Sequence, residues 1–123
     1  MKQQILTGNS KSAHLLSQGI ISNGFIFVSG QVYAKPDLTL IEGTTKEKVD
    51  QIMENISTVL GAANATIDDI VKVVVYVTDM AIMPELNEVY PTYFTEPYHV
   101  REAVCVKALP LGASIEISVV ATK

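Results

Sequence analysis

Residues 114–122 read Ser-Ile-Glu-Ile-Ser-Val-Val-Ala-Thr, and this stretch decides which fold the rest of the chain completes. Apolar and polar residues alternate along it, which is typical of a β-strand whose successive side chains point to opposite faces of a sheet. One face carries only apolar side chains, namely Ile115, Ile117, Val119 and Ala121. The other face carries Ser114, Glu116, Ser118 and Val120. The first face needs a layer of helices to cover it.

Other segments of the chain are predicted to be strands of the same sheet. Residues 19–29 hold two apolar runs on either side of Asn23-Gly24, a pair that suits the turn of a β-hairpin. Residues 71–78 are rich in β-branched side chains, which favours a strand. Residues 103–108 are predicted to form a strand that pairs with residues 114–122 as a final hairpin. A short apolar segment around residues 5–6 precedes all of them.

Two segments have the apolar spacing of helices. Thr44 and Glu47 match a capping box, and the apolar positions that follow step by three and four as far as residue 63. Asn64 is expected to end this helix in a left-handed conformation. The second helix is predicted between residues 83 and 94, with a kink or break at Pro91, because proline removes a backbone hydrogen bond.

The order of elements predicts one α+β domain over residues 1–123, with two helices on one face of a mainly antiparallel sheet. Two helices cannot cover both faces, yet Val74 and Tyr76 place apolar groups on the second face as well. Hydrophobic residues make up 48% of the chain and charged residues 18%, against about 25% charged in an average domain. The low charge favours burial of the second face against other subunits.

Composition argues against several classes of function. The net charge of −4 offers no basic surface for nucleic acid. One cysteine and two histidines, His14 and His99, form no metal-ligand pattern, and Cys105 is expected to be a small buried residue. No apolar run is long enough to span a membrane or serve as a signal peptide, and no glycine-rich cofactor motif occurs. We expect a cytoplasmic protein without metal, cofactor, nucleic acid or membrane partner.

Three groups of residues in order along the chain carry a family resemblance. They are residues 27–32, residues 87–90 ahead of Phe94, and Arg101 with residues 109–110 and 115–117. Together they resemble the YjgF/RidA family of enamine/imine deaminases, over nearly the whole chain. The resemblance implies a chorismate-mutase-like fold of the bacillary type and a homotrimer whose sheets form a central barrel. It also implies sites between subunits that hydrolyse 2-imino acids, formed from enamines such as 2-aminoacrylate, to 2-keto acids and ammonia without a metal or organic cofactor.

The same resemblance assigns roles to residues. Arg101 matches the arginine that holds the substrate carboxylate, Glu116 the glutamate linked to the attacking water, and Ser29-Gly30 a pair that lines the pocket. Three positions differ from the family pattern. Leu16 stands in place of a tyrosine, Ala103 in place of a common cysteine, and His99-Val100 in place of a Pro-x pair.

The chemistry of these side chains agrees with the roles. A guanidinium can pair with both oxygens of a carboxylate. Glu116 lies between two isoleucines, so partial burial is expected to raise the pKa of its carboxyl and to suit it to proton transfer. Plainer interpretations remain open: Glu116 as an exposed strand residue, Arg101 in a surface ion pair with Glu102 or Glu96, and Ser29 as a hydroxyl bound to backbone.

An assumed register tests whether Arg101 and Glu116 converge. If Ala108 pairs with Ser114, Arg101 lies opposite Ala121, about 17 Å along the strand from Glu116. Either the chain bends before Ala103, or the two groups of one site come from different subunits. A family member that binds small carboxylates without turnover is the alternative function, because Leu16 lacks the tyrosine hydroxyl. A chorismate-type mutase is a weaker alternative, and Tyr33 is a candidate to replace the missing tyrosine or a loop aromatic packed on the sheet.

Overall fold

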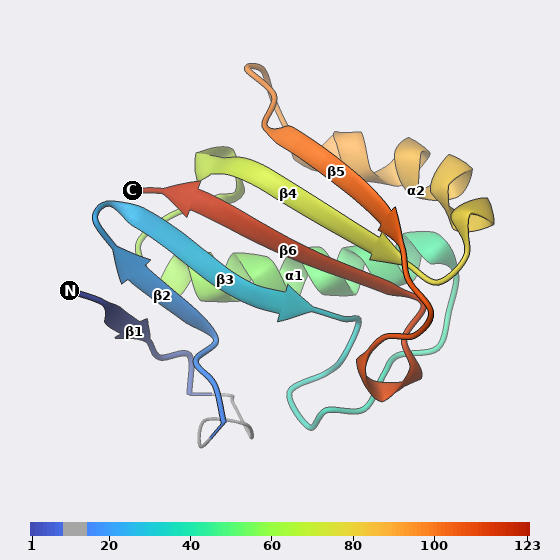
Figure 1. Ribbon diagram of the computed structural model, residues 1–123, viewed down its shortest axis with the longest axis horizontal. Helices are drawn as coiled ribbons and strands as arrows, with labels where there is room; N and C mark the ends of the chain where they lie inside the picture. Colours follow the sequence, from blue (N-terminus) through green and yellow to red (C-terminus); the bar gives the residue numbers. More distant parts are fainter. Residues whose placement is uncertain (9–14) are drawn as a thin grey trace.

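Two α-helices lie on one face of a six-stranded sheet in the computed structural model, which describes residues 1–8 and 15–123 (Figure 1). The strand order is β1-β2-β3-β6-β4-β5. The strands are β1 Gln3–Ile5, β2 Gly19–Ser22, β3 Phe25–Gln31, β4 Ile70–Val77, β5 Val100–Cys105 and β6 Ile115–Thr122. The α-helices are α1 Thr45–Ala62 and α2 Met83–Val89, and short 3-10 turns are η1 Ile67–Asp69, η2 Met80–Ile82, η3 Tyr90–Tyr93 and η4 Pro110–Gly112. The predicted α+β class is confirmed.

The local signals for the hairpin and the first helix are also confirmed. Asn23 and Gly24 both have positive φ, 51° and 80°, as the tight turn between β2 and β3 requires. The Thr44 hydroxyl accepts from the Glu47 amide at 3.2 Å, and the Glu47 carboxylate accepts from the Thr44 amide at 3.0 Å. Asn64 has a φ of 59°, the left-handed conformation expected just beyond the end of α1.

The predicted break at Pro91 is confirmed as well. The second helix is α-helical only as far as Val89, and residues Tyr90–Tyr93 continue as the 3-10 turn η3, with Pro91 as its second residue. Proline cannot donate the backbone hydrogen bond that the next α-helical turn would need. The consequence is that Tyr90 and Phe94 are held close together at the end of α2, with ring centroids 4.8 Å apart.

The predicted final hairpin is wrong. The strand begins at Val100 rather than at Ala103, and it pairs parallel with β4, not antiparallel with β6. β6 already has β3 on one edge and β4 on the other, so no edge remains for β5. The register that assumed pairing of Ala108 with Ser114 is therefore wrong too, and β5 becomes the outer edge of the sheet (Figure 1).

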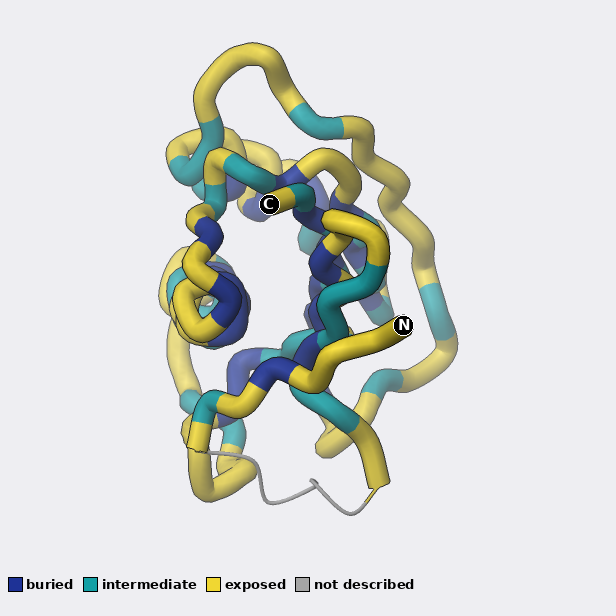
Figure 2. Tube along the Cα trace, turned by 90° about the vertical axis from the view of Figure 1, so that its left-hand side faces the viewer, coloured by how far each residue is buried: buried dark blue, intermediate teal, exposed yellow. Residues whose placement is uncertain are grey.

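The two faces of the sheet differ as the alternation in residues 114–122 predicted. The four apolar side chains on one face of β6 are at most 3% exposed, and they form the core with α1 and the alternate residues of β4. Figure 2 shows the longer helix end-on, with its buried side turned toward the sheet. On the opposite face, which we call the open face, Phe25 and Phe27 are 44% and 46% exposed. No helix in residues 1–8 and 15–123 is long and apolar enough to cross a membrane.

Candidate functional site

Glu116 and Gly30 lie against each other on the open face. β3 and β6 are neighbours, and their pairing is irregular between Val28 and Gln31, which is where Gly30 lies. A Cβ atom added to Gly30 would stand 2.4 Å from Oε2 of Glu116 and 2.9 Å from its Cδ. Glycine at position 30 therefore leaves room for the Glu116 carboxyl group, which a larger residue would displace.

Burial acts on the Glu116 carboxyl group. Glu116 is half-buried between β3 and β4, and this burial raises the pKa of its carboxyl above the ordinary value. Within the described part of the chain, no side chain or amide donates a hydrogen bond to this carboxylate. A carboxyl group with a raised pKa and free lone pairs is suited to accept a proton from water and to pass it on.

Ser29 connects this site to the segment before β2. Its hydroxyl donates to the Ser17 carbonyl at 2.6 Å, and its amide donates to the Gln18 carbonyl at 2.9 Å. The interpretation of Ser29 as a hydroxyl bound to backbone therefore holds in the single chain. The contact also keeps Leu16, the residue just before Ser17, at the end of β3 where Ser29 and Gly30 lie.

Leu16 and Tyr33 have different surroundings. Leu16 is 46% exposed and lines a shallow cavity of about 180 Å³ with residues 4–8 and Gln18. Tyr33 is buried, and its hydroxyl accepts from the Ser114 amide at 2.8 Å. Tyr33 is thus a loop aromatic packed on the sheet, and it does not replace the missing tyrosine.

Arg101 lies on the other side of the sheet from Glu116. It pairs with Val73, whose side chain faces the helices, so the arginine projects beside α2 at the sheet edge. Its Nη1 donates to Oδ1 of Asn87 at 2.8 Å, and its guanidinium carbon lies 5.3 Å from the centre of the Tyr90 ring. The alternative interpretation, an ion pair with Glu102 or Glu96, is not formed among the described residues, and Glu102 pairs with Lys72 at 3.6 Å.

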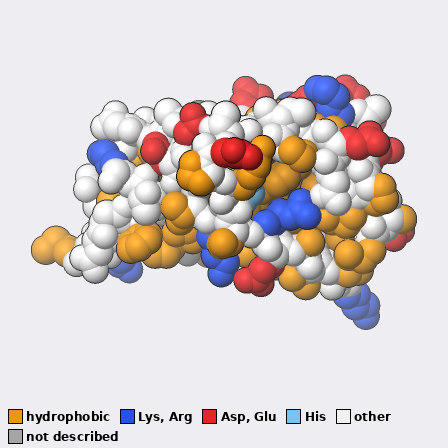
Figure 3. Space-filling view, turned by 90° about the horizontal axis from the view of Figure 1, so that it is seen from above, with side chains coloured by type: hydrophobic (Ala, Val, Ile, Leu, Met, Phe, Trp, Pro, Cys, Tyr) orange, Lys and Arg blue, Asp and Glu red, His pale blue; other side chains and the backbone are white. Residues whose placement is uncertain are grey.

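Ala103 and Cys105 follow Arg101 on the same side of β5. All six residues of β5 are exposed in the single chain, so the expectation of a buried Cys105 is wrong. The reason is that β5 is the edge strand of the sheet and has a neighbouring strand, β4, on one side only. Figure 3 shows one side of the molecule, where a basic side chain and a histidine lie together among hydrophobic side chains.

Arg101 and Glu116 do not converge within one chain. Arg101 pairs with Val73, and Val73 pairs with Val119, which is three residues from Glu116 along β6. This offset corresponds to roughly 10 Å along the strands, and the two intervening strand spacings add about 10 Å across the sheet. The side chains also point to opposite faces. The two groups can act on one small molecule only if they come from different copies of the chain.

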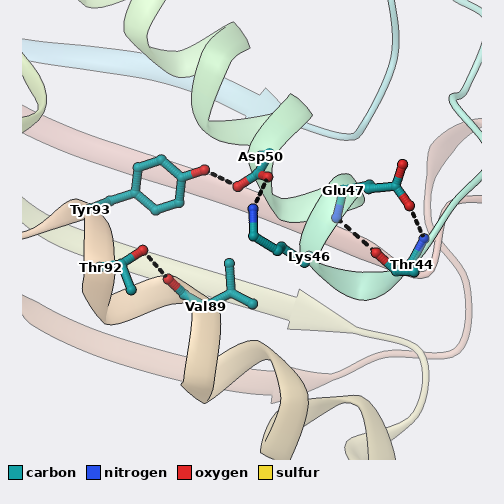
Figure 4. A network of polar contacts seen from close by, with 7 residues as sticks. All are labelled: Thr44, Lys46, Glu47, Asp50, Val89, Thr92 and Tyr93. Atoms are coloured by element: carbon teal, nitrogen blue, oxygen red, sulfur yellow. Dashed lines mark hydrogen bonds and ion pairs between the residues drawn. The ribbon is translucent and has the colours of Figure 1, made fainter.

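Polar side chains also meet between α1 and η3, but they form structural contacts (Figure 4). Tyr93 donates its hydroxyl to Asp50, and Lys46 pairs with the same carboxylate at 2.7 Å. Hydrogen bonds from Lys46 and Tyr93 lower the pKa of Asp50. A cavity of about 350 Å³ lies beside this network. Within residues 1–8 and 15–123, no group of three or more His, Cys, Asp or Glu side chains is placed to hold a metal ion.

Sequence reasoning missed the side chains that surround Arg101. Asn87, Tyr90 and Phe94 belong to the motif that carries the family resemblance, which was the available signal for them. His99, which stands in place of a proline of the family pattern, contacts both Tyr90 and Phe94. His14, the other histidine considered, lies outside the described residues.

Comparisons with known proteins agree with this fold. The sequence model described as endoribonuclease L-PSP matches residues 7–123. Reactive Intermediate Deaminase A, chloroplastic, of Arabidopsis thaliana is 30% identical over 125 residues, covering 99% of this chain and 67% of that protein. The crystal structure of yeast Mmf1 matches with a TM-score of 0.93 and 32% identity, over 100% of this chain and 99% of the other. The structure of E. coli TdcF with bound serine matches with a TM-score of 0.80 and 28% identity, over 88% and 87%.

Proposed function

Since this chain belongs to the YjgF/RidA family, we propose that it hydrolyses small 2-imino acids, such as the 2-iminopropanoate formed from 2-aminoacrylate, to 2-keto acids and ammonia. The proposal is carried by the half-buried Glu116 carboxyl held against Gly30, together with an arginine on the β5 edge. The relative from Arabidopsis thaliana is named as a reactive intermediate deaminase, which supports this class of reaction.

Each residue has a distinct part in the proposed reaction. Arg101 pairs with the substrate carboxylate through its planar guanidinium, which Asn87 and Tyr90 orient. Glu116 accepts a proton from water as the water oxygen bonds to the carbon of the C=N group, and the proton then reaches the nitrogen. The hydroxyl proton of the resulting carbinolamine then passes to the nitrogen as the C=O bond forms and the C–N bond breaks, which releases ammonia and the keto acid. Ser29 and Gly30 line the same site, with Leu16 and Ala103 at positions where the family pattern has other residues.

The proposal includes a homotrimer with sites between subunits. Arg101 and Glu116 lie on opposite faces of one sheet, so a site that uses both requires two copies. The open face, with Phe25 and Phe27 exposed, supplies apolar surface for such an assembly. Serine bound to the relative TdcF supports a small carboxylate as the ligand class. Cytoplasmic location also stays a prediction, which cell fractionation tests.

The experiment generates 2-aminoacrylate in situ and follows keto-acid release with the wild type, Arg101→Ala and the control Lys107→Ala. We expect the wild type and the control to accelerate release, whereas Arg101→Ala does not. Sedimentation should give about three times 13.3 kDa. A stable monomer, or no acceleration by pure wild-type protein, would contradict the proposal.

The alternative is a family member that binds small carboxylates without turnover. It is favoured by the half-exposed Leu16, because an apolar side chain cannot donate the hydrogen bond that a tyrosine would. Binding of a 2-keto acid by the wild type, without acceleration of imine hydrolysis, would select this alternative.

A further inference from the structure

His99 is the centre of a small cluster of rings beside Arg101. Its Nε2 shares a hydrogen bond with the Tyr90 hydroxyl. Its ring stands edge-on to Tyr90 at 5.5 Å between centroids and lies 4.2 Å from the centroid of Phe94. One hydrogen bond and two ring contacts therefore fix the orientation of the His99 ring.

Tyr90 connects this cluster to Arg101. The tyrosine is buried, and one face of its ring receives the guanidinium at 5.3 Å while its hydroxyl meets His99. Asn87 accepts from the same guanidinium at 2.8 Å. The arginine therefore has two fixed supports in the single chain, Asn87 and the Tyr90 ring, and His99 acts on the second of them.

The direction of the hydrogen bond follows from the two pKa values. Burial raises the pKa of the Tyr90 hydroxyl, so the hydroxyl keeps its proton. Burial, and then the positive charge of Arg101, lower the pKa of His99, so the imidazole is neutral at neutral pH. Tyr90 thus donates to an unprotonated Nε2, and the ring proton of His99 is on Nδ1. Donation makes the Tyr90 ring more negative, which strengthens its attraction for the guanidinium.

We propose that His99 is a positioning residue for Arg101: by accepting from the Tyr90 hydroxyl, it holds the ring on which the guanidinium stacks and so orders the carboxylate-binding group. Assignment of a carboxylate to Arg101 rests on the proposed function, whereas the ordering of Arg101 does not. His99 stands where the family resemblance places a proline, so this support belongs to the sequence of this chain.

Protonation of His99 reverses the arrangement. An Nε2–H group must donate to the Tyr90 oxygen, which draws electron density from the ring and weakens the stacking of Arg101. The titratable and charged groups that face His99 are Tyr90 from η3 and Arg101 from β5, and Phe94 contributes a neutral ring. The order of Arg101 should therefore decrease as the pH falls through the lowered pKa of His99.

The test compares the full-length wild type with His99→Phe and His99→Gln. Phenylalanine keeps a ring against Phe94 but has no acceptor, whereas the glutamine oxygen accepts from Tyr90 without titrating. The first measurement is the motion of the Arg101 Nε–H group by ¹⁵N relaxation between pH 5 and 8. The second is the dissociation constant for pyruvate, a 2-keto acid, and the third is KM and kcat for imine hydrolysis.

We expect an ordered Arg101 in the wild type at pH 7.5 and a loss of order as the pH falls. In His99→Phe the Arg101 side chain should be disordered at every pH. In His99→Gln it should be ordered at every pH, with no transition. In His99→Phe the dissociation constant for pyruvate and the KM should both rise by about three- to thirty-fold, while kcat stays within about two-fold of the wild type. His99→Gln should restore both constants to nearly the wild-type values. If His99→Phe fails to fold, loss of the transition in His99→Gln tests the same point.

Failure of the positioning role and failure of the proposed function give different results. Unchanged order of Arg101 in His99→Phe, or a transition that persists in His99→Gln, overturns the positioning role. An arginine whose order depends on His99 in a protein that neither binds pyruvate nor hydrolyses imines keeps the positioning role and refutes the proposed function.

Discussion

The two faces of the sheet are built from the same strands, yet a single chain buries the apolar side chains of only one of them. On the helix-covered face, Ile115 and Ile117 are fully buried against α1 and its neighbours. On the open face, Phe25 and Phe27 keep nearly half of their surface exposed although they lie in an equally apolar strand. The covered face is complete within one chain, whereas the open face has apolar surface that one chain leaves uncovered.

The difference also separates the two residues to which the function is assigned. Glu116 projects from the open face, and Arg101 projects at the edge of the covered side. Alternation along a strand places neighbouring residues on opposite faces. A residue of the core and a residue of the open face can therefore be adjacent in sequence, as Ile115 and the proposed catalytic residue Glu116 are.

The largest expected effect is on catalysis at the open face. Glu116→Gln should lower turnover of 2-iminopropanoate by about 10²- to 10⁴-fold, because glutamine cannot accept the proton from water. Glu102→Gln is the matched control, since Glu102 is a glutamate on the same face but forms only an exposed ion pair with Lys72. Steady-state rates of keto-acid release measure both. Full activity in Glu116→Gln would remove this residue from the mechanism.

The next effect is on stability at the covered face. Ile117→Ala should lower the free energy of unfolding by about 2–5 kcal/mol, because it leaves a cavity in a fully buried position. Ser118→Ala, one residue further and on the open face, should change it by less than about 0.5 kcal/mol. Urea unfolding of both variants tests the contrast. Equal losses would show that the two faces are buried alike.

An apolar position on the open face should control assembly rather than folding. Phe27→Asp should raise the dissociation constant of the proposed trimer by roughly 100-fold, because it would bury an unpaired charge in that assembly. Circular dichroism should stay that of the wild type while sedimentation shifts toward 13.3 kDa. Lys123→Gln, at an exposed position, lowers the net charge by the same single unit and is the control for a change of charge alone. An unchanged trimer in Phe27→Asp would show that this face is not the interface.

Gly30 offers a smaller change at the same site. In Gly30→Ala the new Cβ displaces the end of the Glu116 side chain, which can move, so we expect a fold of nearly normal stability and about a ten-fold loss of turnover. Gly61→Ala is the matched glycine control, because nothing lies within 4 Å of its added Cβ inside α1. That control should stabilise the protein by about 0.5–1 kcal/mol without loss of activity. Unchanged turnover in Gly30→Ala would contradict the placement of the carboxylate.

The smallest effect is the pH dependence that His99 adds to stability. Its pKa is lowered in the folded protein and has the ordinary value of about 6.5 in the unfolded chain. Between these values the unfolded chain binds more protons, so the free energy of unfolding falls as the pH falls below about 6.5 and levels off below the folded-state pKa. The loss should stay below about 1 kcal/mol because His99 is partly exposed. If wild type and His99→Gln show the same pH dependence of the free energy of unfolding, a lowered pKa of His99 is contradicted.

Local patterns were enough for the elements whose residues are adjacent in sequence. The Thr44–Glu47 capping box, the Asn23-Gly24 turn and the break at Pro91 each depend on contacts over a few residues, and all three were predicted. The position of β5 was not. Its pairing with β4 rather than β6 depends on which sheet edges remain open, and no single segment carries that information.

The sequence alone was enough to predict the class of fold and the two faces of the sheet, because alternation and capping are local properties of the chain. The proposed site residues came from the family resemblance. Only the tertiary structure decided that Arg101 and Glu116 lie on opposite faces and that Gly30 makes room for the Glu116 carboxyl. It alone brought His99 onto Tyr90 beside the arginine. These relations join residues that lie on different strands and turns, and packing in three dimensions sets their distances.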